Sequence, residues 1–254
     1  MVPARISCYR APQTVCDVAE IAAWLRDCVD ADIAVRDRFF AVHESETYVD
    51  VFADARVLAP MDPQTGSDMY GIRRYEERVL ANPERGGGVL YDGIAIQRGL
   101  NAALPPSERR LDHLHIVFLD RVIGTWGSHD GRWHKRVSVL GQPTLISVSC
   151  LTEAPAKPAA YYKQKQQSSL LTGDAPPREV LEGTLEEGFL REDDPRTTEA
   201  LKGYALSAVD YLATGDPFCD VRHCRLANPH RHAGVIEAQL TDPSFCPEHA
   251  DRYA

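Results

Sequence analysis

Two short segments near the C-terminus place soft metal ligands in pairs, and this constrains the fold more than any other feature. The first holds Cys219 and Cys224, and the second holds Cys246 and His249. Three thiolates and one imidazole form a donor set typical of tetrahedral zinc, and ligand pairs on turns let a chain wrap the ion. The C-x4-C spacing is wider than the common C-x2-C. The pattern predicts one zinc ion on these four side chains, over the alternative of three ordinary buried cysteines and a surface histidine.

Three further histidines lie in the same region and could replace His249 as a ligand: His223, His230 and His232. His249 is preferred because the run Cys-Pro-Glu-His puts both of its ligands on one tight turn. Four protein ligands leave no position for water. The predicted zinc would therefore support the fold over residues 216–249 and perform no chemistry.

The same stretch resembles archaemetzincins, a branch of the metzincin zinc peptidases. Their motif reads H-E-x-x-H-x-x-G-x-x-H-C-x4-C-x-M and continues later with F-C-x-x-C. Alignment on the first cysteine gives five matching positions: Gly215, Cys219, Cys224, Phe245 and Cys246. Two positions near these matches depart from the motif: Leu226 stands where the motif has methionine, and His249 stands where it has its last cysteine. The resemblance implies a metzincin-like fold with zinc-peptidase ancestry.

The catalytic half of that motif is degenerate. Its three histidine positions read Ala208, Leu212 and Phe218, and Val209 stands at the general-base glutamate. A metzincin site needs two histidines four residues apart on one helix, and no pair among the nine histidines has this spacing. No catalytic residue is therefore assigned.

A set of uncharacterised archaeal proteins named as metallopeptidases is more similar, and resembles this chain over residues 115–118, 153–158 and 203–206. That name implies peptidase ancestry, whereas the apolar motif positions argue against peptidase chemistry. The sequence thus predicts a zinc-binding module without peptidase activity, acting on an unknown protein or peptide partner along the former cleft.

A zinc-dependent hydrolase with a displaced metal centre is the alternative. Four histidines lie close together in sequence: His113, His115, His129 and His134. The first two alternate on a predicted strand and share one of its faces. Histidines that are close in sequence often diverge in space, so the preferred interpretation is that these four do not form one site.

Composition excludes several classes of function. The net charge of −9 argues against nucleic acid as a partner, although Tyr161, Tyr162 and Lys163 mix aromatic and basic groups as such proteins do. A nucleic-acid-associated zinc protein is thus a weaker alternative. Because no run is apolar over about 20 residues and no signal-peptide pattern is present, we expect a cytoplasmic protein. Seven cysteines in that compartment are expected as thiols or metal ligands.

The hydrophobic periodicity predicts an α/β fold. The resemblance implies a single metzincin-like domain over residues 1–254, with a mixed twisted sheet flanked by helices and a C-terminal Cys/His zinc knot. The predicted helices are 14–29, 68–81, 177–190 and one from Asp194 or Thr197 to Thr214; the predicted strands are 32–42, 113–119, 137–140 and 144–149; residues 154–177 are predicted as a polar surface loop.

Overall fold

A five-stranded sheet with the order β2-β1-β4-β8-β7 forms the centre of the computed structural model, which describes residues 2–12, 15–183 and 188–253. The strands are β1 (Arg5–Tyr9), β2 (Asp32–Arg36), β4 (His113–Leu119), β7 (Ser138–Val139) and β8 (Thr144–Ser147). The pairs β1–β2, β1–β4 and β4–β8 are parallel, and β7 is an antiparallel edge strand. Every residue of β4 is buried, as expected for a central strand covered on both faces. The predicted α/β class with a mixed sheet flanked by helices is confirmed.

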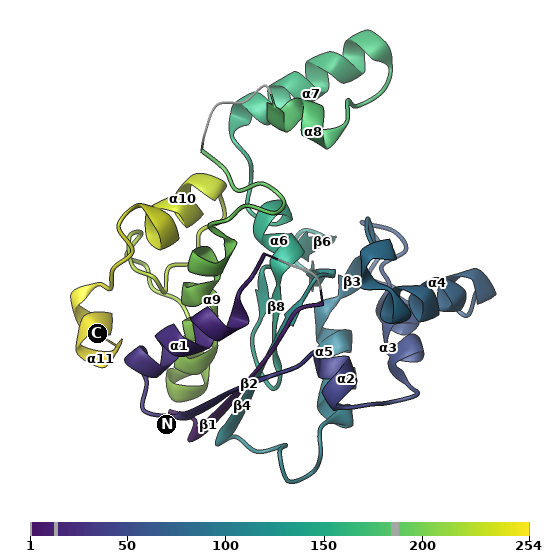
Figure 1. Cartoon of the computed structure of the whole chain (residues 1–254). Helices are drawn as coiled ribbons and strands as arrows, with labels where there is room; N and C mark the ends of the chain where they lie inside the picture. Colours follow the sequence, from purple (N-terminus) through teal and green to yellow (C-terminus); the bar gives the residue numbers. More distant parts are fainter. Residues whose placement is uncertain (1, 13–14, 184–187, 254) are drawn as a thin grey trace.

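Helices cover both faces of this sheet (Figure 1). On one face lie α1 (Val18–Cys28) and α9 (Thr197–Thr214), whose apolar side chains share a core with Ile6, Ile116 and Phe118. On the other face lie α2 (Phe39–Val42), α3 (Tyr48–Ala55) and α5 (Gly93–Ala103), and α4 (Tyr70–Ala81) packs on α3. The second core contains Tyr9, Val117 and Leu119, because alternate residues of a strand point to opposite faces.

A second sheet of three strands has the order β3-β5-β6 and consists of β3 (Leu90–Asp92), β5 (Val122–Gly127) and β6 (Arg132–Lys135). Strands β5 and β6 form an antiparallel hairpin in a segment for which the sequence predicted no strand. The remaining elements are η1 (Pro83–Arg85), α6 (Val148–Glu153), α7 (Ala159–Thr172), α8 (Arg178–Gly183), α10 (His232–Ile236), η2 (Glu237–Thr241) and α11 (Pro247–Tyr253).

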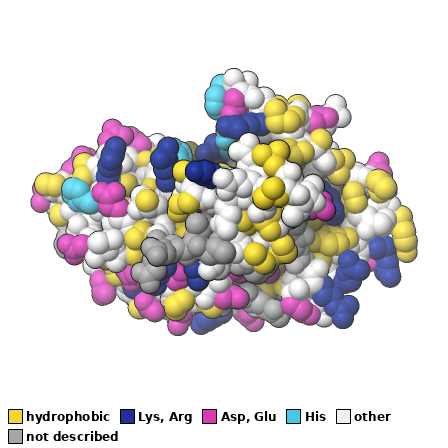
Figure 2. Space-filling view, turned by 90° about the horizontal axis from the view of Figure 1, so that it is seen from above, with side chains coloured by type: hydrophobic (Ala, Val, Ile, Leu, Met, Phe, Trp, Pro, Cys, Tyr) yellow, Lys and Arg dark blue, Asp and Glu magenta, His cyan; other side chains and the backbone are white. Residues whose placement is uncertain are grey.

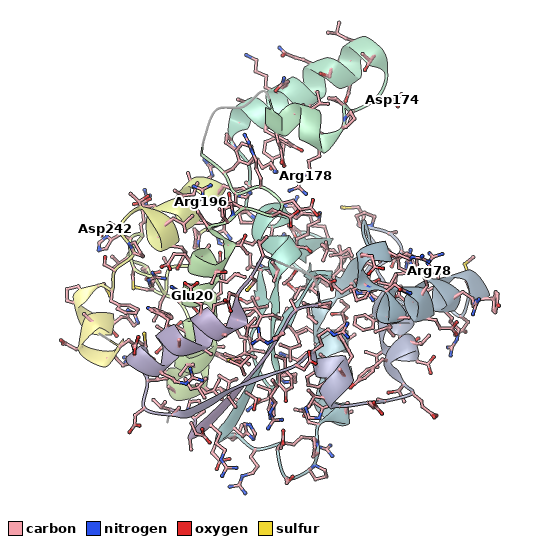
Figure 3. The ribbon with its side chains drawn as sticks, in the orientation of Figure 1. Glu20, Arg78, Asp174, Arg178, Arg196 and Asp242 are labelled. Atoms are coloured by element: carbon pink, nitrogen blue, oxygen red, sulfur yellow. The ribbon has the colours of Figure 1, made fainter. Side chains whose placement is uncertain are left out.

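The predicted helices with a strong apolar period are confirmed. Helix α1 begins four residues later than predicted, because the Asp17 carboxylate caps it by accepting from the Ala19 and Glu20 amides. Residue 14 of the predicted range lies outside the described residues. Helix α9 runs to Thr214 and ends at Gly215, whose φ of 84° favours glycine. Glu20 on α1 forms an ion pair with Lys202 on α9, 2.8 Å away (Figure 3).

Three predicted strands are shorter in the structure, so their predicted lengths were wrong. The strand over 32–42 ends at Arg36, and the aromatic run after it forms α2 instead. Side-chain packing explains why this run is helical and not extended. The centroid of the Phe39 ring lies 5.0 Å from that of Tyr9 and 4.8 Å from that of His43, and one helical turn brings Phe39 and His43 together. Strand β7 has two residues, and β8 ends at Ser147, whose side chain caps α6.

Residues 154–177 were predicted as a loop, and this was wrong, because α7 occupies most of the range. Tyr161 is the one buried residue of α7, so the segment indeed lacks an apolar stripe. Its Ala, Lys, Gln and Leu residues have high helix propensity, so they favour a helix even without an apolar stripe. Gly173 ends it at a φ of 83°.

Helices α7 and α8 form an arm (residues 159–183) that projects from the body (Figure 1). Arg178 lies where this arm meets the body, donating to Glu182 at 2.6 Å and lying 3.8 Å from Glu153 of α6 (Figure 3). The predicted helix over 177–190 corresponds to α8, which ends at Gly183. Residues 184–187 lie outside the described part, and residues 188–190 are not helical.

Candidate metal centre

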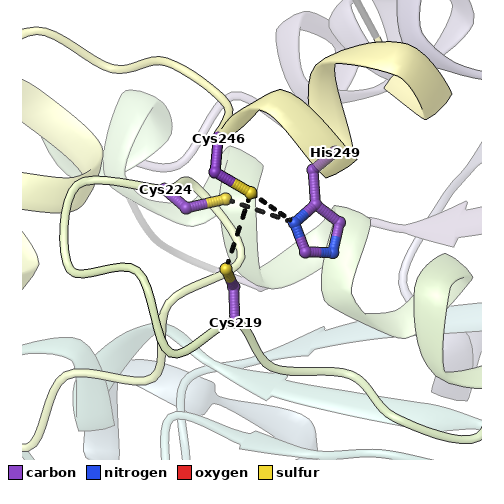
Figure 4. Close-up of side chains that lie close together, drawn as sticks. All are labelled: Cys219, Cys224, Cys246 and His249. Carbon is purple, nitrogen blue, oxygen red and sulfur yellow. Dashed lines mark hydrogen bonds between the residues drawn. The ribbon is translucent and has the colours of Figure 1, made fainter.

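The four predicted zinc ligands lie together at the C-terminal end of α9 (Figure 4). Cys219 and Cys224 belong to the loop after Gly215, which is closed by a hydrogen bond from the Cys219 amide to the Leu226 carbonyl at 2.8 Å. Cys246 directly precedes α11, and His249 follows one turn later on the same face of that helix. Proline at the first position of α11 suits a helix start, since that amide needs no partner.

The spacing of the ligand atoms fits a tetrahedral ion. The sulfurs of Cys219 and Cys246 are 3.7 Å apart, and the Cys224 sulfur lies 3.7 Å from Nδ1 of His249. Sulfurs bound at about 2.3 Å from a tetrahedral zinc lie about 3.7–3.8 Å apart. Nδ1 of His249 lies closer to the Cys246 sulfur, at 3.0 Å. All four ligand atoms lie within 4.8 Å of one another, so the group could hold a metal ion.

The thiols of this cluster differ in how readily they ionise. Burial raises the pKa of Cys219 to about 12 and also raises that of Cys224. Burial also opposes ionisation of Cys246, but hydrogen bonds from the backbone and ring of His249 and from the thiols of Cys219 and Cys224 outweigh it and lower the pKa of Cys246 to about 7. A metal ion would supply the positive charge that the other two thiolates require.

The far side of the His249 ring faces a buried carboxylate that sequence reasoning missed as a site residue. Nε2 of His249 lies 4.0 Å from Oδ2 of Asp210 on α9. The other oxygen of Asp210 accepts from Tyr253 at 2.5 Å and from Arg252 at 2.7 Å. An imidazole that offers Nδ1 to a metal carries its proton on Nε2, and a carboxylate beyond that proton fixes the ring. The position of Asp210 on α9 does not predict its contact with His249, because α11 is distant in sequence.

The three other candidate ligands lie outside the cluster. His223 and His230 are exposed. His232 is buried, and its two ring nitrogens bond to the Leu190 amide at 3.1 Å and to the Thr152 carbonyl at 3.2 Å.

The positions that align with the catalytic part of the metzincin motif contribute no polar group. Ala208 and Val209 are fully buried in the core beneath α9, as their apolar character predicts. Apolar packing does not cover the neighbouring face of α9. A hollow of about 440 Å³ opens there between α9 and β7, lined in part by Tyr204, Tyr211 and Phe218.

The histidines proposed as a displaced centre fall into two groups among the described residues. His113 and His115 lie on β4, with their rings stacked at 4.2 Å, and approach Glu108. Both nitrogens of His115 are engaged, with the Tyr9 hydroxyl at 2.9 Å and the Glu108 carbonyl at 3.1 Å. The Glu108 carboxylate is held by Arg36 at 2.7 Å. A cation at this group would have to break both bonds of the His115 ring, which is fully buried.

His129 and His134 lie on the other sheet, at the tip of the β5–β6 hairpin, where they surround Asp130. His129 is exposed and the side chains of Asp130 and His134 are half-buried, whereas His113 and His115 are buried. The four histidines are therefore not brought to one point.

All seven cysteines lie within the described residues, and none of them forms a disulfide, as predicted. Across residues 2–12, 15–183 and 188–253, no helix combines the length and apolar character that crossing a membrane requires. Acidic and basic side chains are interspersed over the face seen in Figure 2, with no continuous basic field on it.

The fold and the site define an α/β protein with sheets flanked by helices and a C-terminal cluster of three cysteines and one histidine that could hold a metal ion. The chain belongs to a family of unknown function (DUF7001), whose family model matches residues 7–252. No curated protein matches it.

Among solved structures, a zinc-dependent peptidase from Methanocorpusculum labreanum is similar, with a TM-score of 0.48 and 9% identity over 97% of this chain and 98% of that chain. A similarity this weak supports no argument about activity. The function proposed below therefore depends on residues of this chain.

Proposed function

We propose that this protein is a zinc-stabilised binding module on an archaemetzincin-like scaffold, without peptidase activity. The observation that carries the proposal is the convergence of Cys219, Cys224, Cys246 and His249 at tetrahedral spacings. Soft thiolates with one imidazole favour zinc over the harder cations. One structural zinc would hold α11 and the cysteine loop against α9, which closes a single domain over residues 1–254.

The absence of peptidase activity is proposed from the chemistry of α9. A zinc peptidase needs three ligands with an open position for water, and a base beside that water. Ala208, Val209 and Leu212 supply neither a ligand nor a base. A shell of three cysteines and one histidine is closed to water, so its zinc is not a catalytic one.

A peptide segment of a partner protein is the proposed ligand, bound in the hollow between α9 and β7. Tyrosines and Phe218 supply apolar surface there, and Lys135, Arg136 and His230 supply basic groups at its border. The lining contains no acidic side chain. We therefore expect an apolar peptide segment that carries an acidic residue.

Metal content tests the zinc proposal. Protein purified without added metal should contain one zinc per chain by mass spectrometry, retained through dialysis. Zinc occupancy should fall in Cys219→Ser and in Cys224→Ser, but not in Cys150→Ser, a buried thiol outside the cluster. Metal-free protein that is as stable as the purified form would refute a structural zinc.

Hydrolysis assays test the second half of the proposal. Purified protein should show no chelator-sensitive cleavage of casein or of mixed peptide libraries. Restoring Ala208→His, Leu212→His and Phe218→His with Val209→Glu should create a second zinc-binding event if α9 has the metzincin register. Chelator-sensitive hydrolysis by the unmodified protein, abolished by His115→Ala, would overturn the proposal in favour of a displaced catalytic centre.

A further inference from the structure

We propose that the tip of the β5–β6 hairpin is a second metal site, in which His129, Asp130 and His134 bind a divalent transition metal ion that exchanges with solvent. This site is separate from the cysteine cluster, and it does not depend on the function proposed above. Its evidence is the geometry of the hairpin.

Three donors converge on one point. Oδ1 of Asp130 lies 2.9 Å from Nε2 of His134 and 3.7 Å from Nε2 of His129. The two imidazole rings are nearly parallel, with an interplanar angle of 11° and centroids 5.8 Å apart. One ligand atom from each residue lies within 4.8 Å of the other two. Small movements of these side chains would therefore place their three ligand atoms around one ion.

The hairpin fixes this arrangement before any ion binds. Arg132 donates to the other oxygen of Asp130 at 2.7 Å, which turns Oδ1 toward the two imidazoles. Gly127 makes room for the group, because a Cβ there would lie 2.6 Å from both Asp130 Oδ1 and His134 Nε2. Trp133 anchors the strand by donating to the Asp62 carbonyl at 2.7 Å. Ligands held in advance lower the entropic cost of binding an ion.

The chemistry of the donors selects the class of ion. Two imidazole nitrogens and one carboxylate oxygen suit zinc, nickel or cobalt, whereas magnesium and calcium prefer oxygen ligands. Three protein ligands leave coordination positions open. A hollow of about 590 Å³ borders the two histidines, and its lining includes Arg132, Lys135 and Arg136 as well as the acidic Glu153. We infer that water or a small anion completes the shell.

Calorimetric titration of the purified protein with Ni²⁺ tests the site, with Mg²⁺ as the control ion. One Ni²⁺ per chain should bind while the zinc content of the same sample stays constant. His134→Ala should weaken Ni²⁺ binding by roughly tenfold or more, since losing a residue that only hydrogen-bonds to a metal ligand already weakens metal binding by about that factor. His129→Ala should do the same, and its side chain is 78% exposed, so the variant should fold normally.

Two controls make the result specific. His223→Ala removes an exposed histidine beside the cysteine cluster and should leave Ni²⁺ binding unchanged. Gly127→Ala keeps all three ligands but crowds them, and should weaken Ni²⁺ binding. The proposal fails if Ni²⁺ binds no better than Mg²⁺, if it binds only by displacing zinc, or if His134→Ala binds as tightly as the unmodified protein.

Discussion

Asp210 is a carboxylate on α9 that is 1% exposed and that meets three side chains of α11. In the sequence it directly follows Val209. In the structure it lies behind His249, on the side of the ring away from the sulfurs. A buried carboxylate in that place orients a metal-binding imidazole and stabilises its proton on Nε2.

We predict that Asp210→Asn weakens zinc binding by roughly 10- to 100-fold, the range for partners of metal-binding histidines. Competition with a chromophoric chelator measures this affinity. The matched control is Asp220→Asn, which removes the same charge from an exposed position in the cysteine loop and should leave the affinity unchanged. Equal zinc affinity in Asp210→Asn and the unmodified protein would show that Asp210 does not position His249.

Cys246 contacts both the Cys219 sulfur and the His249 ring, so its removal should open the cluster. We predict that Cys246→Ser loses zinc and more than about 4 kcal/mol of unfolding free energy, as expected when a structural metal is lost. Denaturant unfolding measures the loss, and limited proteolysis should show new cleavage within residues 216–249. Cys28→Ser, on α1 and outside the cluster, is the control. A Cys246→Ser protein that keeps both its zinc and its stability would mean that Cys246 is not a ligand.

At the scale of elements, α9 and the cysteine loop approach each other through a glycine. A Cβ at Gly203 would lie 2.4 Å from the Arg225 carbonyl and 2.3 Å from the Gln239 side chain. The loop backbone next to Cys224 therefore rests directly on α9. Gln239 strengthens this contact by donating to the Arg225 carbonyl at 2.8 Å.

We predict that Gly203→Ala destabilises the protein by about 1–3 kcal/mol, because backbone must shift to admit the methyl group. Since the displaced backbone carries Cys224, zinc affinity should fall as well. Gly71→Ala is the control on another helix, where a Cβ meets nothing within 4 Å and should be neutral or stabilise by up to about 1 kcal/mol. Thermal unfolding with and without zinc separates the two effects. Identical melting temperatures for the two variants would contradict the close approach.

At the scale of the whole molecule, two fully buried histidines connect segments that are distant in sequence. His115 joins β4 to Tyr9 and Glu108, and His232 joins α10 to Leu190 and Thr152. Burial is the main cause that lowers the pKa of each ring to about 4, against 6.5 for an exposed histidine. Both rings are therefore neutral in the folded protein at neutral pH.

This predicts a loss of stability in mild acid. Below pH 6.5 these two histidines bind protons in the unfolded chain but stay neutral in the folded protein. Proton binding therefore stabilises the unfolded state, and the free energy of unfolding falls as the pH drops toward 4. Each ring contributes up to about 3 kcal/mol over that range. Urea unfolding between pH 7.5 and 4.5, with zinc in excess, measures the slope. The slope should be shallower in His115→Gln or His232→Gln than in the exposed control His223→Gln, and three equal slopes would contradict the prediction.

The sequence by itself determined the parts of this protein that depend on local chemistry. Cysteine and histidine pairs on turns indicated the ligand set, because a metal shell is assembled from short segments. The apolar period predicted α1, α4 and α9, and it is clearest in α1, which buries Val18, Ile21, Ala22 and Leu25 along one face. The absence of a histidine pair four residues apart excluded the metzincin helix motif without any structure.

Tertiary structure alone decided the rest, because it depends on distances between residues far apart in the chain. It brought His249, which the sequence favoured over His223, His230 and His232, beside the three sulfurs. It separated His115 from His134 onto two sheets, and it set Asp210 behind His249. Packing against Tyr9 turned Phe39 from the predicted strand into a helix. In α7 the local helix propensity outweighed the missing apolar stripe, since a helix on the surface needs to bury little.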